Sequence, residues 1–88
     1  MSVEAKNLEV KRVNPPRELK KDGTVFGKIQ ELNCLDHEGG RAVTAQIDDE
    51  SKFGSVHPGD FISGEIRRAR MYGSTLQLTA DWVVTKKK

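Results

Sequence analysis

The feature that most constrains this chain is a repeated alternation of apolar and polar residues. Residues 43–47 read Val-Thr-Ala-Gln-Ile, and residues 76–82 read Leu-Gln-Leu-Thr-Ala-Asp-Trp. A side-chain period of two is typical of a strand with one buried face, and no window shows the spacing of an amphipathic helix. The alternation therefore predicts an all-β fold.

Turn signals divide the chain into five such strands. Asn14-Pro15-Pro16 ends the first strand, residues 36–40 form a turn cluster, residues 48–58 form an irregular loop, and residues 71–74 form a tight loop. Because Pro and Gly punctuate strands at these places, the pattern predicts a small barrel or sandwich, which the OB type fits. We expect one domain over residues 1–88, a five-stranded OB-like barrel with residues 86–88 as a frayed basic tail.

One irregularity interrupts the second of these strands. Val25, Gly27 and Ile29 have one parity, whereas the apolar residues Leu32 and Cys34 that follow have the other. Such a phase slip is what a single extra residue in a strand produces. It predicts a β-bulge or bend near residues 30–31.

Cysteine usage and hydropathy bear on the compartment. Cys34 is the only cysteine, so no disulfide forms within the chain. No apolar run approaches the roughly 20 residues that a membrane span needs, and residues 1–10 lack the apolar stretch of a signal peptide. We expect a cytoplasmic protein without membrane contact.

Residues that could carry catalysis are few and scattered. Cys34, His37 and His57 stand at spacings that match no zinc motif, and Asp48-Asp49-Glu50 lacks the glycine and ligand periodicity of a calcium loop. No nucleophile elbow or phosphate-binding loop is present. The sequence predicts a protein that is not an enzyme and that uses no metal, cofactor or small-molecule substrate.

Charge is unevenly distributed although the net charge is only +2. Basic residues cluster at 11–12, 17–21, 67–70 and 86–88, and acidic residues at 36–38 and 48–50. Such a surface can bind a polyanion on one side, or it can be a solvated surface of mixed charge. Two segments distinguish these interpretations.

The first segment is a basic ribbon over residues 17–28. Asp22-Gly23 is a strong signal for a hairpin tip, so Arg17, the nearby lysines and Phe26 would lie along a protruding ribbon. Cations follow phosphates, and an exposed ring lets a base stack. The alternative is that Phe26 belongs to the core and the lysines protect an edge strand from aggregation.

The second segment, residues 67–74, places the only tyrosine, Tyr72, at a turn beside three arginines. A tyrosine at a loop tip among arginines can serve as a stacking platform, and the alternative is a ring that packs over its own hairpin. Trp82 is in phase with Leu76, Leu78 and Ala80, so we expect it in the core or at an interface.

Taken together, these segments resemble the single-stranded DNA-binding proteins of filamentous bacteriophages, the gene V protein family. The resemblance covers nearly the whole chain. It includes the opening strand at residues 8–11, the ribbon around Gly23 with Phe26, and Cys34 and Asp36 before a turn. It continues with Ile47 and the irregular loop of residues 48–58, which we call the acidic loop. Its last parts are His57-Pro58-Gly59-Asp60-Phe61, the Tyr72-Gly73-Ser74 loop with Leu76, and Val83-Val84 with lysines. Order, spacing and length agree together.

The resemblance implies a homodimer with a five-stranded OB-like fold, a hairpin wing and a dyad loop. Such a protein binds single-stranded DNA cooperatively in the host cytoplasm, coats the replicated viral strand and blocks its conversion to the double-stranded form. The family also represses translation of phage mRNA. By position, Arg17, Lys21 and Phe26 match wing residues, and Tyr72 matches the aromatic residue at the tip of the dyad loop.

The chain departs from the family pattern at several positions. Leu35 and Arg41 stand where the family has tyrosines, Ala80 and Gln46 stand where it has basic residues, and the dyad loop is one residue shorter. Weaker stacking could be offset electrostatically by Arg41 and the lysine tail. The full set of predicted nucleic-acid-binding residues is Arg17, Lys20, Lys21, Phe26, Lys28, Arg41, Arg68, Arg70 and Tyr72.

Two other functions fit parts of the same sequence. A cytosolic RNA-binding OB domain of the ribosomal or initiation-factor kind could also contain Gly23-Thr24-Val25 and Gly59-Asp60. An adaptor domain would carry its basic residues for solubility alone. Comparing RNA with DNA oligomers separates the first alternative, and a salt titration of binding separates the second.

Overall fold

The computed structural model describes residues 3–86, and it is all-β apart from one turn of 3-10 helix. The strands are β1 (Glu4–Val13), β2 (Arg17–Lys21), β3 (Thr24–Asp36), β4 (Arg41–Ile47), β5 (Phe61–Tyr72), β6 (Thr75–Ala80) and β7 (Val83–Lys86). The 3-10 turn η1 (Glu50–Lys52) lies in the acidic loop. No helix of the described chain has the length and apolar character to cross a membrane.

Five strands form a closed ring of hydrogen-bonded neighbours. Around the ring the order is β1, β3, β4, β6 and β5, and β5 pairs with β1 to close it. All of these pairings are antiparallel except that of β4 with β6. The five ring strands are those that the alternation predicts. The all-β prediction is confirmed.

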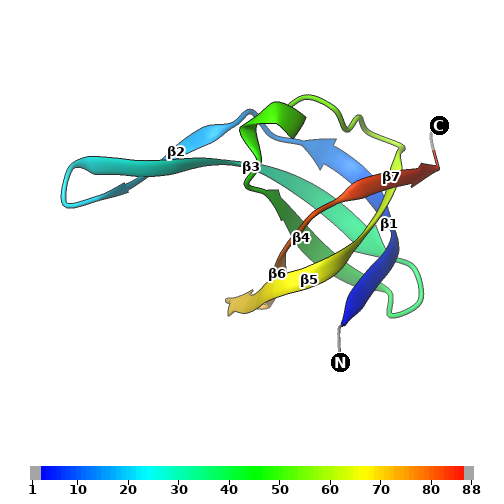
Figure 1. The fold of residues 1–88 in the computed structure, drawn as a ribbon. Helices are drawn as coiled ribbons and strands as arrows, with labels where there is room; N and C mark the ends of the chain where they lie inside the picture. Colours follow the sequence, from blue (N-terminus) through cyan, green and yellow to red (C-terminus); the bar gives the residue numbers. More distant parts are fainter. Residues whose placement is uncertain (1–2, 87–88) are drawn as a thin grey trace.

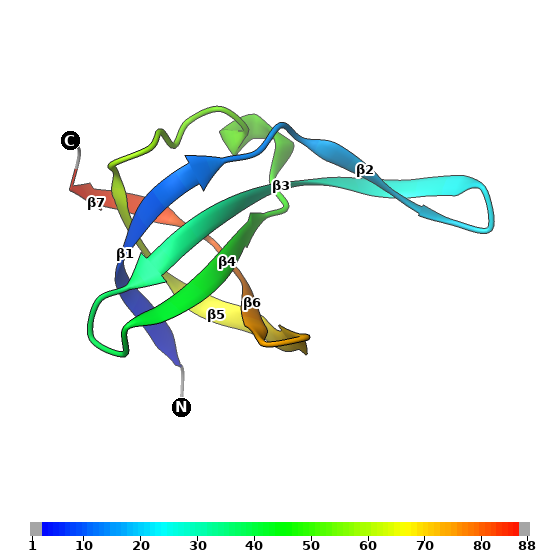
Figure 2. The same ribbon diagram turned by 180° about the vertical axis from the view of Figure 1, so that it is seen from behind.

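Strands β2 and β7 lie outside the ring. Strand β2 pairs with the first half of β3 in a hairpin that projects from the ring (Figures 1 and 2), and we call this hairpin, residues 17–29, the wing. Strand β7 pairs with β5, and Lys86 lies opposite Phe61 with its ammonium 5.7 Å from the centre of that ring. The prediction of a frayed tail is therefore wrong at Lys86; residues 87–88 lie outside the described chain.

The wing turns where the sequence predicts. Asp22 and Gly23 have φ values of 53° and 78°, the left-handed conformation that a two-residue hairpin turn requires at both positions. Gly23 adopts this conformation without a Cβ clash, and Asp22 belongs to the residue types that tolerate it. The Asp-Gly pair thus closes the hairpin with Lys21 opposite Thr24.

The bulge in β3 does not lie near residues 30–31. The ladder between β3 and β4 is regular from Gln30 to Asp36, whereas the register with β2 shifts so that Phe26 is the extra residue. Val25 therefore faces the side opposite to Gly27 and Ile29. The apparent phase slip has a different cause. After Ile29 the neighbour of β3 changes from β2 to β1, and the buried face of the strand changes with it. Ile29 and Gln30 are consequently both buried, although they project to opposite faces.

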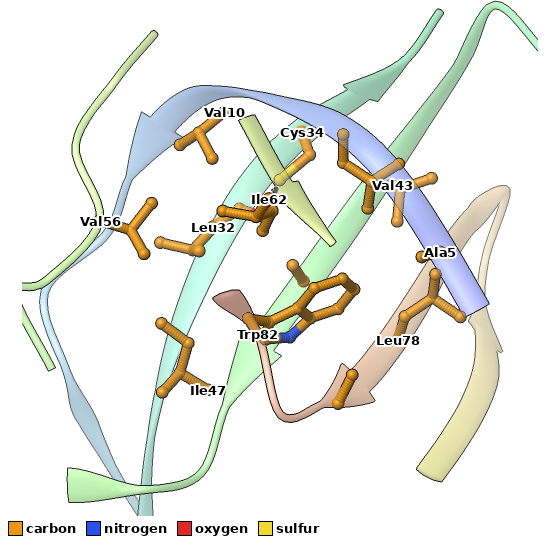
Figure 3. Packing of buried hydrophobic residues seen from close by; sticks show 13 residues of the cluster. Ala5, Val10, Leu32, Cys34, Val43, Ile47, Val56, Ile62, Leu78 and Trp82 are labelled. Carbon is orange, nitrogen blue, oxygen red and sulfur yellow. Dashed lines mark hydrogen bonds between the residues drawn. The ribbon is translucent and has the colours of Figure 1, made fainter. Parts of the chain in front are cut away.

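The core fills the interior of the ring (Figure 3). Leu32, Ile62 and Val10 are its largest fully enclosed side chains. Trp82, 5% exposed, packs into the same cluster, and its indole N–H donates a hydrogen bond to the Gln46 carbonyl oxygen at 3.0 Å. This places Trp82 in the core. The acidic loop adds Val56 to the cluster, with Phe53 packed against it.

One glycine permits a close approach within the core. A Cβ on Gly64 would lie 3.0 Å from the Asp81 carbonyl oxygen and 3.1 Å from the Ala80 Cβ. These distances are too short for an unstrained contact, so β5 at this point must lack a side chain. The segment that leads from β6 into Trp82 can therefore lie directly against β5.

Candidate nucleic-acid interface

A groove of about 400 Å³ crosses the outer face of the ring beside the base of the wing. One wall consists of Arg17, Leu19 and Ile29 from the wing. The opposite wall consists of Arg68, Arg70 and Tyr72 from β5. The floor is polar and consists of Glu31, Gln46, Gln77 and Thr79. Three of the predicted arginines and the predicted tyrosine thus lie around one cavity, which we call the central groove.

The register of the β5–β6 hairpin explains why the β5 side chains share this face. Arg68 lies opposite Thr79, Arg70 opposite Gln77, and Tyr72 opposite Thr75. Directly opposed residues of antiparallel strands project to the same side, and residues two apart along a strand do so as well. The intervening Ala69 and Met71 consequently face the other way.

The arginines of this wall are available to an anion. Across residues 3–86 no acidic group forms an ion pair with Arg68 or Arg70, and both residues are exposed. Tyr72 is 68% exposed, so its ring does not pack closely over its own hairpin. An exposed ring beside two such cations is suited to a ligand that combines flat rings with negative charge.

The face of the wing that borders the groove continues to the wing tip. Arg17, Leu19 and Lys21 alternate along β2 on this face. Phe26 lines a shallow recess at the tip together with Lys21, Asp22 and Thr24. At 65% exposure Phe26 is not a core residue, so the core alternative for this ring is wrong. A ligand strand that leaves the groove can therefore follow cations and an aromatic ring along the wing.

Other predicted residues lie elsewhere. Lys20 and Lys28 occupy the opposite face of the wing, because they pair with Val25 and Glu18 and are out of phase with Lys21. Arg41 lines a separate recess of about 250 Å³ at another part of the ring, beside Glu4, Asp36 and Glu38. The structure thus brings together Arg17, Arg68, Arg70 and Tyr72, extends them with Lys21 and Phe26, and leaves Lys20, Lys28 and Arg41 outside the groove.

A chain of hydrogen bonds crosses the groove floor from β6 to the wing. The Thr79 hydroxyl donates to Gln46 Oε1 at 3.0 Å, and Gln46 Nε2 donates to Glu31 Oε2 at 3.3 Å. Glu31 Oε1 then accepts from Arg17 Nε at 2.8 Å. Because each side chain is held by the next, the guanidinium of Arg17 is oriented before any ligand arrives. Such preorganisation reduces the entropy that binding must offset.

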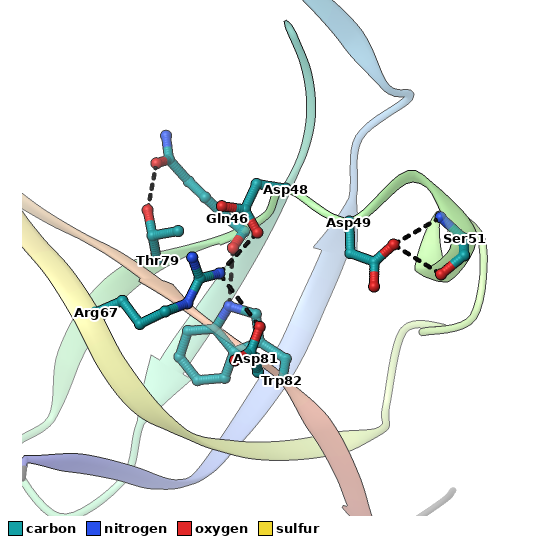
Figure 4. Close-up of polar contacts among 8 residues, drawn as sticks. All are labelled: Gln46, Asp48, Asp49, Ser51, Arg67, Thr79, Asp81 and Trp82. Atoms are coloured by element: carbon teal, nitrogen blue, oxygen red, sulfur yellow. Dashed lines mark hydrogen bonds and ion pairs between the residues drawn. The ribbon is translucent and has the colours of Figure 1, made fainter.

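Next to the groove, a smaller recess of about 220 Å³ ends at an ion-paired arginine. Arg67 Nη2 lies 2.7 Å from Asp48 Oδ1 and 3.3 Å from Asp81 Oδ1 (Figure 4). The hydrogen bond from Arg67 lowers the pKa of the Asp48 carboxyl, so the pair is ionised at neutral pH. Since its charge is already compensated, Arg67 offers less attraction to a phosphate than Arg68 and Arg70 do.

No cysteine lines the groove in the described part of the chain. Cys34 is buried on β3, and burial raises the pKa of its thiol to about 12, so it is protonated at neutral pH. Within residues 3–86, no three acidic, histidine or cysteine side chains are grouped as a metal site would require. What the arrangement can do is hold a flat, anionic ligand by charge, stacking and hydrogen bonds.

Sequence reasoning missed most of the floor. Gln46, Gln77 and Thr79 are the polar partners in the very alternation that predicts strands β4 and β6. Their parity marks them as outward-facing, which is a signal that the sequence does contain. It does not show that β4 and β6 are neighbours, because their pairing is parallel and non-local.

A comparison of the chain with protein-family models, with curated proteins and with solved structures yields no match. The groove, the wing and the chemistry of their side chains are the features that bear on function.

Proposed function

We propose that this protein binds single-stranded DNA without strong sequence preference, through the central groove and the adjoining face of the wing. The observation that carries the proposal is the β5 wall of the groove: Arg68 and Arg70, which have no ion-pair partner among residues 3–86, stand beside the exposed Tyr72. Arg17, which is ion-paired with Glu31, faces them across a polar floor. Cations aligned beside exposed aromatic rings are the usual means of binding unpaired nucleic acid. The ring of five strands with a wing is consistent with an OB-like fold, which is part of the proposal.

The exposed rings favour single strands over a duplex. Tyr72 and Phe26 can stack only on bases whose faces are free, and in a duplex those faces are covered by neighbouring base pairs. A duplex would still be attracted to the arginines, but it would gain nothing from the rings. Affinity for a single strand should therefore exceed affinity for a duplex of the same length.

The resemblance to the gene V protein family gives this binding a biological role. The protein would coat replicated phage DNA in the host cytoplasm, cooperatively along the strand, and so block conversion to the double-stranded form. Repression of phage mRNA translation would use the same surface. These roles need binding alone.

A homodimer is the second part of the proposal. The face of the β5–β6 hairpin that turns away from the groove is apolar, and it is uncovered toward the turn, where Met71 is 60% exposed beside half-buried Leu76. Exposed apolar surface at the end of a hairpin favours association with a second copy. Sedimentation should show a dimer at micromolar concentration, and a monomer would contradict this part of the proposal.

A salt titration with oligo-dT tests the proposal as a whole. We expect log affinity to fall linearly with log salt, with a slope of about −0.7 for each phosphate contact on a single strand. Binding that does not change with salt, or equal affinity for single strand and duplex, would overturn it. Tighter binding to an RNA oligomer of the same sequence would identify an RNA-binding domain instead.

The two faces of the wing provide a matched pair of variants. Lys21→Ala removes a cation from the face that continues the groove, so the salt slope should become shallower by about 0.7. Lys20→Ala removes the neighbouring cation from the opposite face and should change the slope much less. The measurement is the oligo-dT titration of both variants. Equal changes in slope would mean that the wing does not bind through one face.

A further inference from the structure

One feature of the central groove works against a polyanion. Among the described residues that line the groove, Glu31 carries the only carboxylate. Its side chain is 21% exposed, so the charge is accessible from the groove. Glu31 is ion-paired with Arg17 at 2.8 Å, so the two side chains together offer a phosphate little attraction, whereas Arg68 and Arg70 on the β5 wall attract it. A bound strand should therefore turn its phosphates toward that wall and its bases toward the floor.

Glu31 is held in place with acceptor capacity left over. Its Oε1 accepts from Arg17 and its Oε2 accepts from Gln46, which uses two of the roughly four lone-pair sites of a carboxylate. The Gln46 amide is occupied on both sides, since its oxygen accepts from Thr79. The remaining acceptor sites of Glu31 are thus a fixed feature of the floor.

A carboxylate distinguishes bases by their edges. Cytosine carries an exocyclic amino group that donates to a carboxylate, whereas uracil and thymine carry a carbonyl oxygen at that position, which a carboxylate repels. The pairing of Glu or Asp with the cytosine amino group is an established mode of base recognition. Stacking on Tyr72 does not make this distinction, because every base has a π-face.

We propose that Glu31 makes the groove prefer bases with an exocyclic amino group, so that cytosine is bound more tightly than uracil or thymine. This inference rests on the proposed single-strand binding and adds a composition preference to it. Glu31 has three effects: it orients Arg17, it lowers general affinity for the backbone, and it favours amino-bearing bases over carbonyl-bearing ones.

Oligomers of deoxycytidine and deoxyuridine give the sharpest test, because their rings differ only at the edge that meets the carboxylate. At fixed salt and neutral pH, we expect the wild-type protein to bind oligo-dC about three- to tenfold more tightly than oligo-dU, the size of one charge-assisted hydrogen bond at a partly exposed site. Equal affinities would overturn the inference while leaving single-strand binding intact. Failure to bind either oligomer, even at low salt, would overturn the proposed function as well.

Glu31→Gln identifies the residue responsible. Glutamine keeps the shape and can still accept from Arg17, but it removes the charge and the second acceptor, to which Gln46 Nε2 donates. We expect the variant to bind oligo-dU more tightly than the wild type does and to lose most of the preference for oligo-dC. Glu38→Gln, which removes the same charge from a recess outside the groove, should leave the preference unchanged. A preference that survives in Glu31→Gln would show that another group reads the base.

Discussion

Replacing Tyr72 with alanine is expected to weaken oligo-dT binding by about 1–3 kcal/mol, or about five- to 150-fold, because one base loses its stacking partner. The ring is 68% exposed at the end of β5, so its removal should hardly affect the core. Fluorescence anisotropy of a labelled oligomer, measured at one salt concentration, gives the affinity of both proteins.

Two controls make the Tyr72 result specific. Tyr72→Phe keeps the ring and should bind nearly as tightly as the wild type. The salt slope of Tyr72→Ala should equal that of the wild type, because no cation has been removed. Unchanged affinity in Tyr72→Ala would mean that bases do not stack on this residue.

The largest expected effect on stability comes from Trp82→Ala, which should lower the free energy of unfolding by about 3–5 kcal/mol. Trp82 is 5% exposed within the ring, and its removal leaves a cavity and removes the hydrogen bond to the Gln46 carbonyl oxygen. Because this is the only tryptophan, urea unfolding should be followed by circular dichroism for both proteins at equal concentration.

Trp82→Phe separates packing from hydrogen bonding. Phenylalanine fills part of the space but cannot donate to the Gln46 carbonyl, so we expect an intermediate loss of stability. A Trp82→Ala protein within about 1 kcal/mol of the wild type would contradict the packing described for the core. The hydrogen bond from Trp82 to the Gln46 carbonyl also supports the candidate site. It holds the backbone of β4 at Gln46, whose side chain forms part of the groove floor.

Local signals in the sequence predicted much of the fold. The alternation in residues 43–47 and 76–82 predicts strands β4 and β6, although β6 ends at Ala80 and Trp82 lies beyond it. Asp22-Gly23 predicts the wing tip, because strand period and hairpin turns are decided by neighbouring residues. The parallel pairing of β4 with β6 could not be predicted, and neither could the closure of the ring by β1 and β5. Both depend on contacts between residues far apart in the chain.

The candidate site was predictable only in part, for the same reason. Arginines and an aromatic ring at 68–72 are visible in the sequence, but their position across from Arg17 depends on how the wing leaves the ring. The bulge at Phe26 turns Val25 to the face opposite Gly27, and the sequence gives no sign of it. Lys20 and Lys21 were predicted together because the sequence does not show which face of β2 borders the groove.

The wing is held by a single ladder between β2 and β3, and none of its residues belongs to the core cluster within the described chain. Ile29 at the base of the wing is buried, but the residues nearer the tip are exposed or half-buried, so substitutions there should cost the ring little. The outer part of the wing can therefore be redesigned without disturbing the packing of the ring. Folding stability and the surface offered by the hairpin are thus divided between separate segments of one small chain.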